Sequence, residues 1–143
     1  MDFRRNTRFE DLAKELIDTE TCLVMLRLAN VKVVVIMSDK VKLDEIGNRI
    51  YADCEKIPPK FMWATDADVM ITVYELNIAG LTEQQKRIVI MRELMKIHCD
   101  ESDGKRKIKI MDFDLKDFKL IVDRYGVNWD KETDLFTEVE KKL

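Results

Sequence analysis

A helix with almost no polar face is encoded between residues 84 and 97, and it limits the architectures open to the chain. The apolar positions in this stretch are Ile88, Val89, Ile90, Met91, Leu94, Met95 and Ile97. They cover most of a helix circumference, which indicates a helix packed on several sides rather than laid on a surface. Thr82 stands three residues ahead of Gln85, and this spacing predicts a capping box at the start of the helix.

The rest of the chain alternates short β-branched runs with amphipathic segments. Residues 8–28 have apolar positions at helical spacing and predict one helix, or two with a bend that Asp18 or Thr19 would cap. Strands are expected at 31–37, 48–54, 68–74 and 105–111, an acidic turn at 100–104, and further helices from Asp114 and over 131–142. This order describes an α+β domain with a short mixed or antiparallel sheet, packed on the central helix and flanked by N-terminal and C-terminal helices.

Length and composition fit one folded domain. The chain has 143 residues, of which 46% are hydrophobic and 37% charged, and its formal net charge is −3. So small a net charge gives no indication of a nucleic-acid partner. Three widely spaced cysteines, Cys22, Cys54 and Cys99, predict neither a disulfide framework nor a zinc knuckle. The longest aliphatic runs are far shorter than the roughly 20 residues of a bilayer span, so we expect a cytoplasmic protein without a membrane segment.

The second half of the central helix has one narrow polar break, the run from Arg92 to Lys96. In zinc peptidases a helix with His-Glu-x-x-His holds the metal with two imidazoles one turn apart and uses the Glu as general base. Here Glu93 is kept, but Arg92 and Lys96 stand at the two ligand positions. Residues four apart project over the same helix face. Arg92 and Lys96 are therefore expected to share one helix face, as two zinc ligands would, although neither is a zinc ligand.

Segments on both sides of this frame resemble the phage metallopeptidases, a small zincin-like family. The similar segments correspond to the family's first strand, the stretch ahead of its sheet, its edge strand, the start of its active-site helix and its C-terminal signature. They are, in that order, 31–40, 51–63, 68–75, 81–85, and 114–118 with 123–129. The resemblance implies a single zincin-like domain over 1–143, with a helical part at 1–30, a family-like core at 31–131 and a C-terminal helix at 131–143.

The family's three zinc-binding histidines correspond to Arg92, Lys96 and Phe113 of this chain, and only its general base is matched, by Glu93. Arginine has no lone pair to donate, and lysine has one only after losing its proton. At an effective dielectric constant of about 20, each cation about 4 Å from a divalent ion would be repelled by roughly 8 kcal/mol. These departures predict a pseudoenzyme without metal, cofactor or catalytic residues, in which Arg92, Glu93 and Lys96 form an ion-pair cluster.

Other candidate sites have simpler interpretations. His98, the only histidine, is expected at the helix end as a capping or packing residue. The acidic stretch 100–104 lacks the spacing of a calcium loop. The densest basic cluster is Lys105, Arg106, Lys107 and Lys109. These cations either discourage edge-to-edge pairing of an exposed strand or form a contact surface for an acidic or nucleic-acid partner.

Together with the resemblance, these observations predict a protein of phage or mobile-element origin that acts by binding a protein in a bacterial host. A concrete version is an inhibitor of a host defence nuclease, comparable to an anti-CRISPR protein. Two alternatives stay open: a hydrolase or metalloprotein that uses another site, and a structural phage protein.

Overall fold

The computed structural model describes residues 3–61, 63–102, 105–111 and 125. Its main sheet has the strand order β1-β2-β4-β3. In chain order these strands are β1 (Phe3–Arg5), β2 (Val33–Ser38), β3 (Ala52–Lys56) and β4 (Val69–Tyr74). Strands β2 and β4 run parallel, and β1 and β3 are antiparallel to their neighbours. A hairpin of β5 (Ile97–Ser102) and β6 (Lys105–Ile110) forms a second sheet. The predicted α+β class with a mixed sheet is therefore confirmed for this part of the chain.

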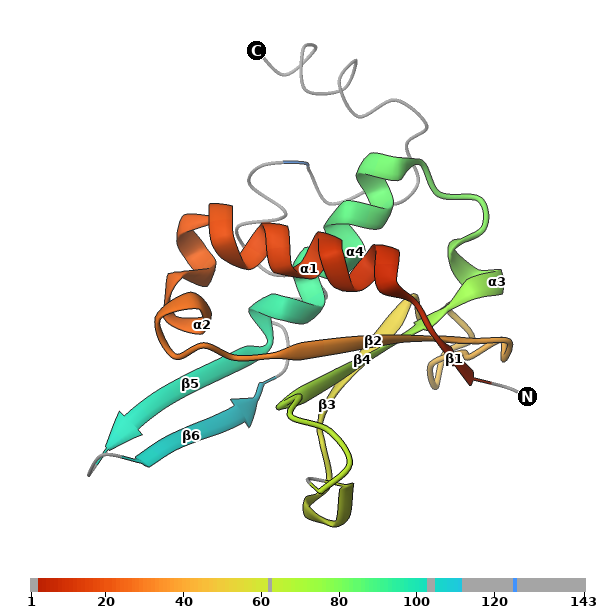
Figure 1. Ribbon diagram of the computed structural model, residues 1–143. Coiled ribbons are helices and arrows are strands. Elements are labelled where there is room, and N and C mark those ends of the chain that lie inside the picture. Colours follow the sequence, from red (N-terminus) through yellow and green to blue (C-terminus); the bar gives the residue numbers. More distant parts are fainter. Residues whose placement is uncertain (1–2, 62, 103–104, 112–124, 126–143) are drawn as a thin grey trace.

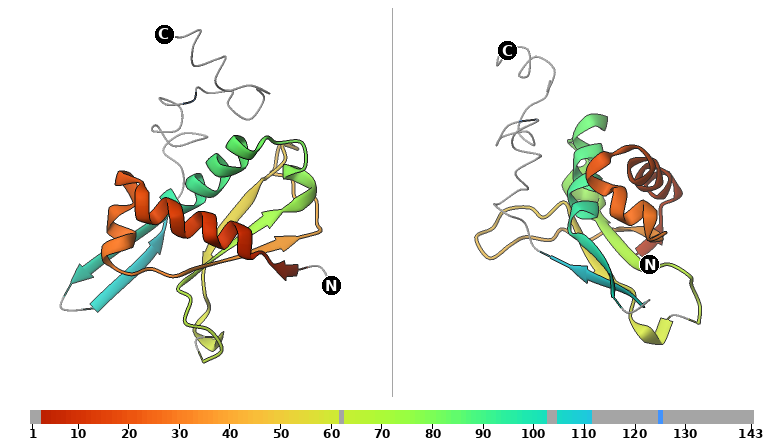
Figure 2. Two further views of the ribbon diagram at one scale, coloured as in Figure 1. Left: turned by 45° about the horizontal axis from the view of Figure 1, so that its top comes forward. Right: turned by 90° about the vertical axis from the view of Figure 1, so that its left-hand side faces the viewer.

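The helices vary in length, and the two longest lie over one face of the main sheet. They are α1 (Thr7–Thr19), α2 (Val24–Leu28), α3 (Glu75–Ile78) and α4 (Glu83–Met95), with short 3-10 turns at Thr21–Leu23 and Pro59–Phe61. Helix α1 packs against β2 and α4, and α4 also contacts β3. Figures 1 and 2 show α1 and α4 crossing over the sheet, while the β5–β6 hairpin projects from the end of α4. Within the described residues, no helix is long and apolar enough to cross a bilayer.

The core lies between α4, α1 and the covered face of the sheet. Side chains with no exposed surface include Leu16 of α1, Val35 of β2, Val69, Ile71 and Val73 of β4, and Ile90 and Leu94 of α4. Helix α4 buries seven of its residues, on several sides, which confirms its predicted central position. It begins with the predicted capping box: the Gln85 amide donates to Thr82 Oγ1 (3.2 Å), and the Thr82 amide donates to Gln85 Oε1 (2.7 Å).

The end of the central helix was predicted too late. Helix α4 stops at Met95 with Lys96 as its C-cap, and Ile97 already begins β5, where it pairs with Ile110 of β6. His98 is therefore a strand residue opposite Lys109, not a helix-end residue. The predicted acidic turn at 100–104 is wrong for residues 100–102, because they continue β5. Their pairing places Asp100 opposite Lys107 in the hairpin.

Three further predictions differ from the structure, one in the main sheet and two in the N-terminal region. Strand β4, the one similar to the family's edge strand, lies inside the sheet, and the edge beside it is β3. The N-terminal part is not only helical, because Phe3–Arg5 forms β1. Neither Asp18 nor Thr19 caps the second helix: the N-cap of α2 is Leu23, which makes no side-chain capping bond. The predicted helices from Asp114 and over 131–142 lie outside the described residues.

Candidate functional site

The degenerate metal frame occupies the last turn of α4 and its C-cap. Glu93 has 2% of its surface exposed and Lys96 has 9%, whereas Arg92 is half-buried. The Lys96 Nζ donates to Glu93 Oε1 at 2.8 Å, so the two side chains form a buried ion pair spanning three residues. The predicted contact between Glu93 and Lys96 is confirmed. The carboxylate that would serve as general base in a zinc peptidase is bound to an ammonium group of its own helix.

Burial and charge act in opposite directions on the Glu93 carboxyl. Desolvation is the largest effect, and it raises the pKa of Glu93 above its ordinary value of 4.5. The positive charges of Lys96 and Arg92 act to lower this pKa, and the negative charge of Asp53 raises it further. The pKa of Glu93 is raised overall, because burial disfavours the charged carboxylate more than Lys96 and Arg92 stabilise it.

A cysteine of the neighbouring edge strand, β3, lies beside the site. Cys54 of β3 packs against the core, close enough to α4 for the charges of Glu93 and Lys96 to act on it. Burial, aided by the Glu93 charge, raises the pKa of the Cys54 thiol to about 12. The thiol therefore stays protonated near neutral pH and is neither a nucleophile nor a ready metal ligand. The sequence analysis missed this neighbour, although alternation along β3 places Cys54 on the same face as the buried Ala52.

The residues of this site do not fit a zinc ion. Zinc needs three or four donors with free lone pairs, and Arg92 and Lys96 bring cationic nitrogens to the ligand positions. Glu93 is the one acidic group of the frame, and its carboxylate already accepts the Lys96 ammonium. Within the described ranges, no three His, Cys, Asp or Glu residues come together in a way that could hold a metal. The third family position, Phe113, lies outside the described residues.

The basic cluster on β6 is divided between the two faces of the hairpin. Arg106 turns toward the body of the protein, where its guanidinium donates to the carbonyls of Ala29 (2.9 Å) and Asn30 (3.3 Å) and to Asp68 Oδ1 (2.7 Å). Its neighbours on that face, Ile108 and Ile110, pack against the core. Lys107 and Lys109 lie on the opposite face and are exposed. Lys105 stands opposite Ser102 in the same alternation. Arg106 thus holds the hairpin against the rest of the protein, and Lys107 and Lys109 lie on its outer surface.

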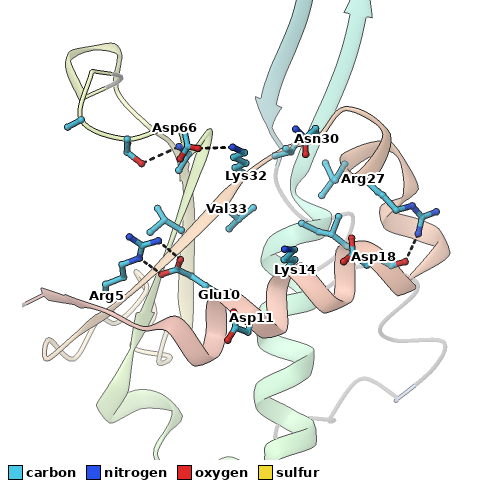
Figure 3. A pocket seen from close by; sticks show the side chains of 17 residues that line it. Arg5, Glu10, Asp11, Lys14, Asp18, Arg27, Asn30, Lys32, Val33 and Asp66 are labelled. Carbon is cyan, nitrogen blue, oxygen red and sulfur yellow. Dashed lines mark hydrogen bonds and ion pairs between the residues drawn. The ribbon is translucent and has the colours of Figure 1, made fainter.

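A cavity lies away from the α4 site. It has a volume of about 590 Å³ and is lined by α1, α2, the start of β2 and the loop at 64–67. Figure 3 shows two ion pairs among its charged side chains, Arg5 with Glu10 and Lys32 with Asp66, while Arg27 donates to the backbone carbonyl of Asp18. Since no residue of α4 lines this cavity, we place the candidate site at the Glu93–Lys96 pair.

The described part of the chain thus combines a mixed sheet, a central helix over it and a buried Glu93 in the last turn of that helix. The family described as Putative phage metallopeptidase matches residues 1–137, so the chain belongs to that family. The matched range is wider than the 31–131 resemblance, because it includes β1 and α1. No curated protein and no solved structure matches the chain.

Proposed function

We propose that this chain is a family member that has lost the zinc site and acts by binding another protein. The observation that carries the proposal is the buried ion pair between Lys96 and Glu93. It places a cation against the catalytic carboxylate, where the family's architecture calls for a zinc ligand. Replacing a histidine by such a lysine removes a metal ligand and also occupies the base, so neither zinc binding nor water activation is supported there.

The outer face of the β5–β6 hairpin is the contact surface within this proposal. Lys107 and Lys109 are exposed, and neither forms an ion pair within the described part of the chain. Side chains of this kind favour an acidic surface on a partner and speed its association. The expected partner is a protein of the bacterial host, and a defence nuclease is the concrete version that the family's link to phages supports.

Affinity purification from the bacterium that carries the gene tests the proposal. The wild-type chain is expected to retain one host protein in stoichiometric amount. The Lys107→Glu, Lys109→Glu double variant should lose most of it, because two repulsive charges replace two attractive ones. Lys14→Glu, at an exposed lysine of α1, is the matched control and should retain the partner. Failure to recover any stoichiometric protein would contradict the proposal, whereas one equivalent of bound zinc and peptide hydrolysis would favour the alternative of an active enzyme.

A further inference from the structure

The loop between β3 and β4 carries the most exposed aromatic side chains of the described chain. Trp63 has 86% of its surface exposed and Phe61 has 47%. Both belong to the connection between β3 and β4, which extends beyond the main sheet (Figures 1 and 2). Single exposed apolar residues are common, but here an indole and a benzyl group two residues apart in sequence are exposed on one loop, whose outer end is called the tip below. Tryptophan is also among the residues that most often dominate the free energy of protein–protein binding.

Internal hydrogen bonds hold the backbone of this loop in shape. At its base the Ile57 amide donates to the Asp68 carbonyl (3.1 Å). Near the tip the Phe61 amide donates to the Pro58 carbonyl (2.9 Å), and the Ala64 amide donates to the Phe61 carbonyl (3.0 Å). Two consecutive prolines reduce the conformational freedom of the unbound loop further. A preorganised loop loses less conformational entropy on binding, so its aromatic side chains can contribute more of their burial to affinity.

Positive charge accompanies the aromatic tip. Lys56, at the end of β3, and Lys60 are exposed, and neither forms an ion pair in the described ranges. The Lys60 Nζ lies 5.2 Å from the centre of the Phe61 ring, which keeps its charge beside the apolar surface. The two acidic residues of the loop, Asp66 and Asp68, are bound by Lys32 and Arg106, each at 2.7 Å. The tip therefore presents two aromatic rings with a free positive rim.

We infer that the 57–68 loop inserts Trp63 and Phe61 into an apolar pocket of a protein partner, with carboxylates at the pocket rim facing Lys56 and Lys60. The inference deepens the proposed function and rests on it, since it names a contact surface and the chemistry of the partner. The two lysines beside the tip are too few for the several phosphate contacts by which proteins hold a nucleic-acid backbone. Two aromatic side chains are also too little apolar surface for stable attachment to a bilayer.

Site-directed photo-crosslinking in the bacterium that carries the gene tests this docking site. Replacing Trp63 by p-benzoylphenylalanine puts a photoreactive aromatic group at the tip. Replacing Leu76 of α3, which is 54% exposed at the other end of β4, gives the matched control. A discrete protein adduct is expected from position 63 and not from position 76. Lys60→Glu should weaken the position-63 adduct about tenfold or more, as for a hot-spot contact, while Lys14→Glu should leave it unchanged.

Fluorescence with defined probes excludes the other occupants. Trp129→Phe leaves Trp63 as the single tryptophan, since the chain has two. Its emission in the free protein is expected to be that of a solvated indole, open to quenching by acrylamide. Vesicles of phosphatidylglycerol and phosphatidylethanolamine, or a thymidine oligonucleotide, should not shift it. A shift with either probe, or a buried indole in the free protein, would overturn the inference.

The outcomes separate this inference from the proposed function. If the wild-type chain retains a stoichiometric host protein that crosslinks at another position and is unaffected by Trp63→Ala, the docking site is wrong and the binding function stands. If no position yields an adduct and no protein is retained, both are wrong. An adduct of twice the chain's mass would mean that the tip binds a second copy, which also contradicts the inference.

Discussion

At the scale of single residues, the central feature of the candidate site is a buried carboxylate bound to a buried ammonium group. Glu93 and Lys96 are 2.8 Å apart with almost no exposed surface. Their attraction must offset the loss of two hydration shells, and buried ion pairs commonly add little net stability. Removing one partner is different, because it leaves the other charge buried and uncompensated.

A double-mutant cycle measures this asymmetry. Lys96→Met and Glu93→Leu are each expected to lower the free energy of unfolding by about 3–5 kcal/mol, because each leaves one buried charge without its partner. The double variant should lie close to the wild type, since two apolar side chains of similar size replace the pair. Urea denaturation of the four proteins at neutral pH gives the coupling free energy. Additive losses in the double variant would show that the pair is not buried as a unit.

The raised pKa of Glu93 predicts how stability changes with pH. Since the folded-state pKa lies above the ordinary 4.5, the contribution of Glu93 is fully present below that ordinary value and is lost as pH rises through the folded pKa. The unfolding free energy of the wild type relative to Glu93→Gln should therefore fall as pH increases above about 4.5. Denaturation at a series of pH values checks this, with Glu55→Gln, at an exposed carboxyl, as control. A relative stability that rises with pH over the same interval would contradict the assignment.

At the scale of elements, the β5–β6 hairpin shows what sequence patterns resolve and what they miss. The alternation over 105–111 predicts β6 correctly. Closeness in sequence, however, suggests that Arg106 and the three lysines form one basic cluster. Period-two geometry separates them, because Arg106 shares its face with Ile108 and Ile110. The end of α4 was misplaced for a related reason. Nothing local separates Ile97 from the helix, and its strand conformation depends on pairing with the distant Ile110.

Arg106 is expected to hold the hairpin against the body. Arg106→Met removes donors to two backbone carbonyls and to Asp68, and should lower the free energy of unfolding by about 1–2 kcal/mol, given partial exposure of the guanidinium. Lys107→Met, one residue along on the outer face, should change it by less than about 0.5 kcal/mol. Amide hydrogen exchange of β5 and β6 should accelerate in the first variant alone. Equal effects of both substitutions would show that Arg106 does not hold the hairpin against the rest of the protein.

At the scale of the whole molecule, the chain belongs to the phage metallopeptidase family and its described part has an α+β fold. The α+β class, the central helix and its capping box could be predicted from sequence, because apolar periodicity and capping are local. The strand order could not, since the parallel pairing of β2 with β4 joins residues far apart in the chain. Of the expected cluster of Arg92, Glu93 and Lys96, the structure shows the ion pair between Glu93 and Lys96. The place of Cys54 beside the ion pair follows only from the packing of β3 on α4.

Zinc titration of the purified protein tests the central claim most directly. Isothermal titration and metal analysis should detect no zinc bound at α4 of the wild type. Arg92→His, Lys96→His and Phe113→His together should restore measurable zinc affinity, because they rebuild the three ligands of the family. This triple variant is the positive control for the scaffold, and a folded form of it that binds no zinc would show the register to be wrong. The wild type is predicted to stay metal-free under the conditions that load the triple variant. About one equivalent of zinc in the wild type, lost on Glu93→Gln, would contradict the account.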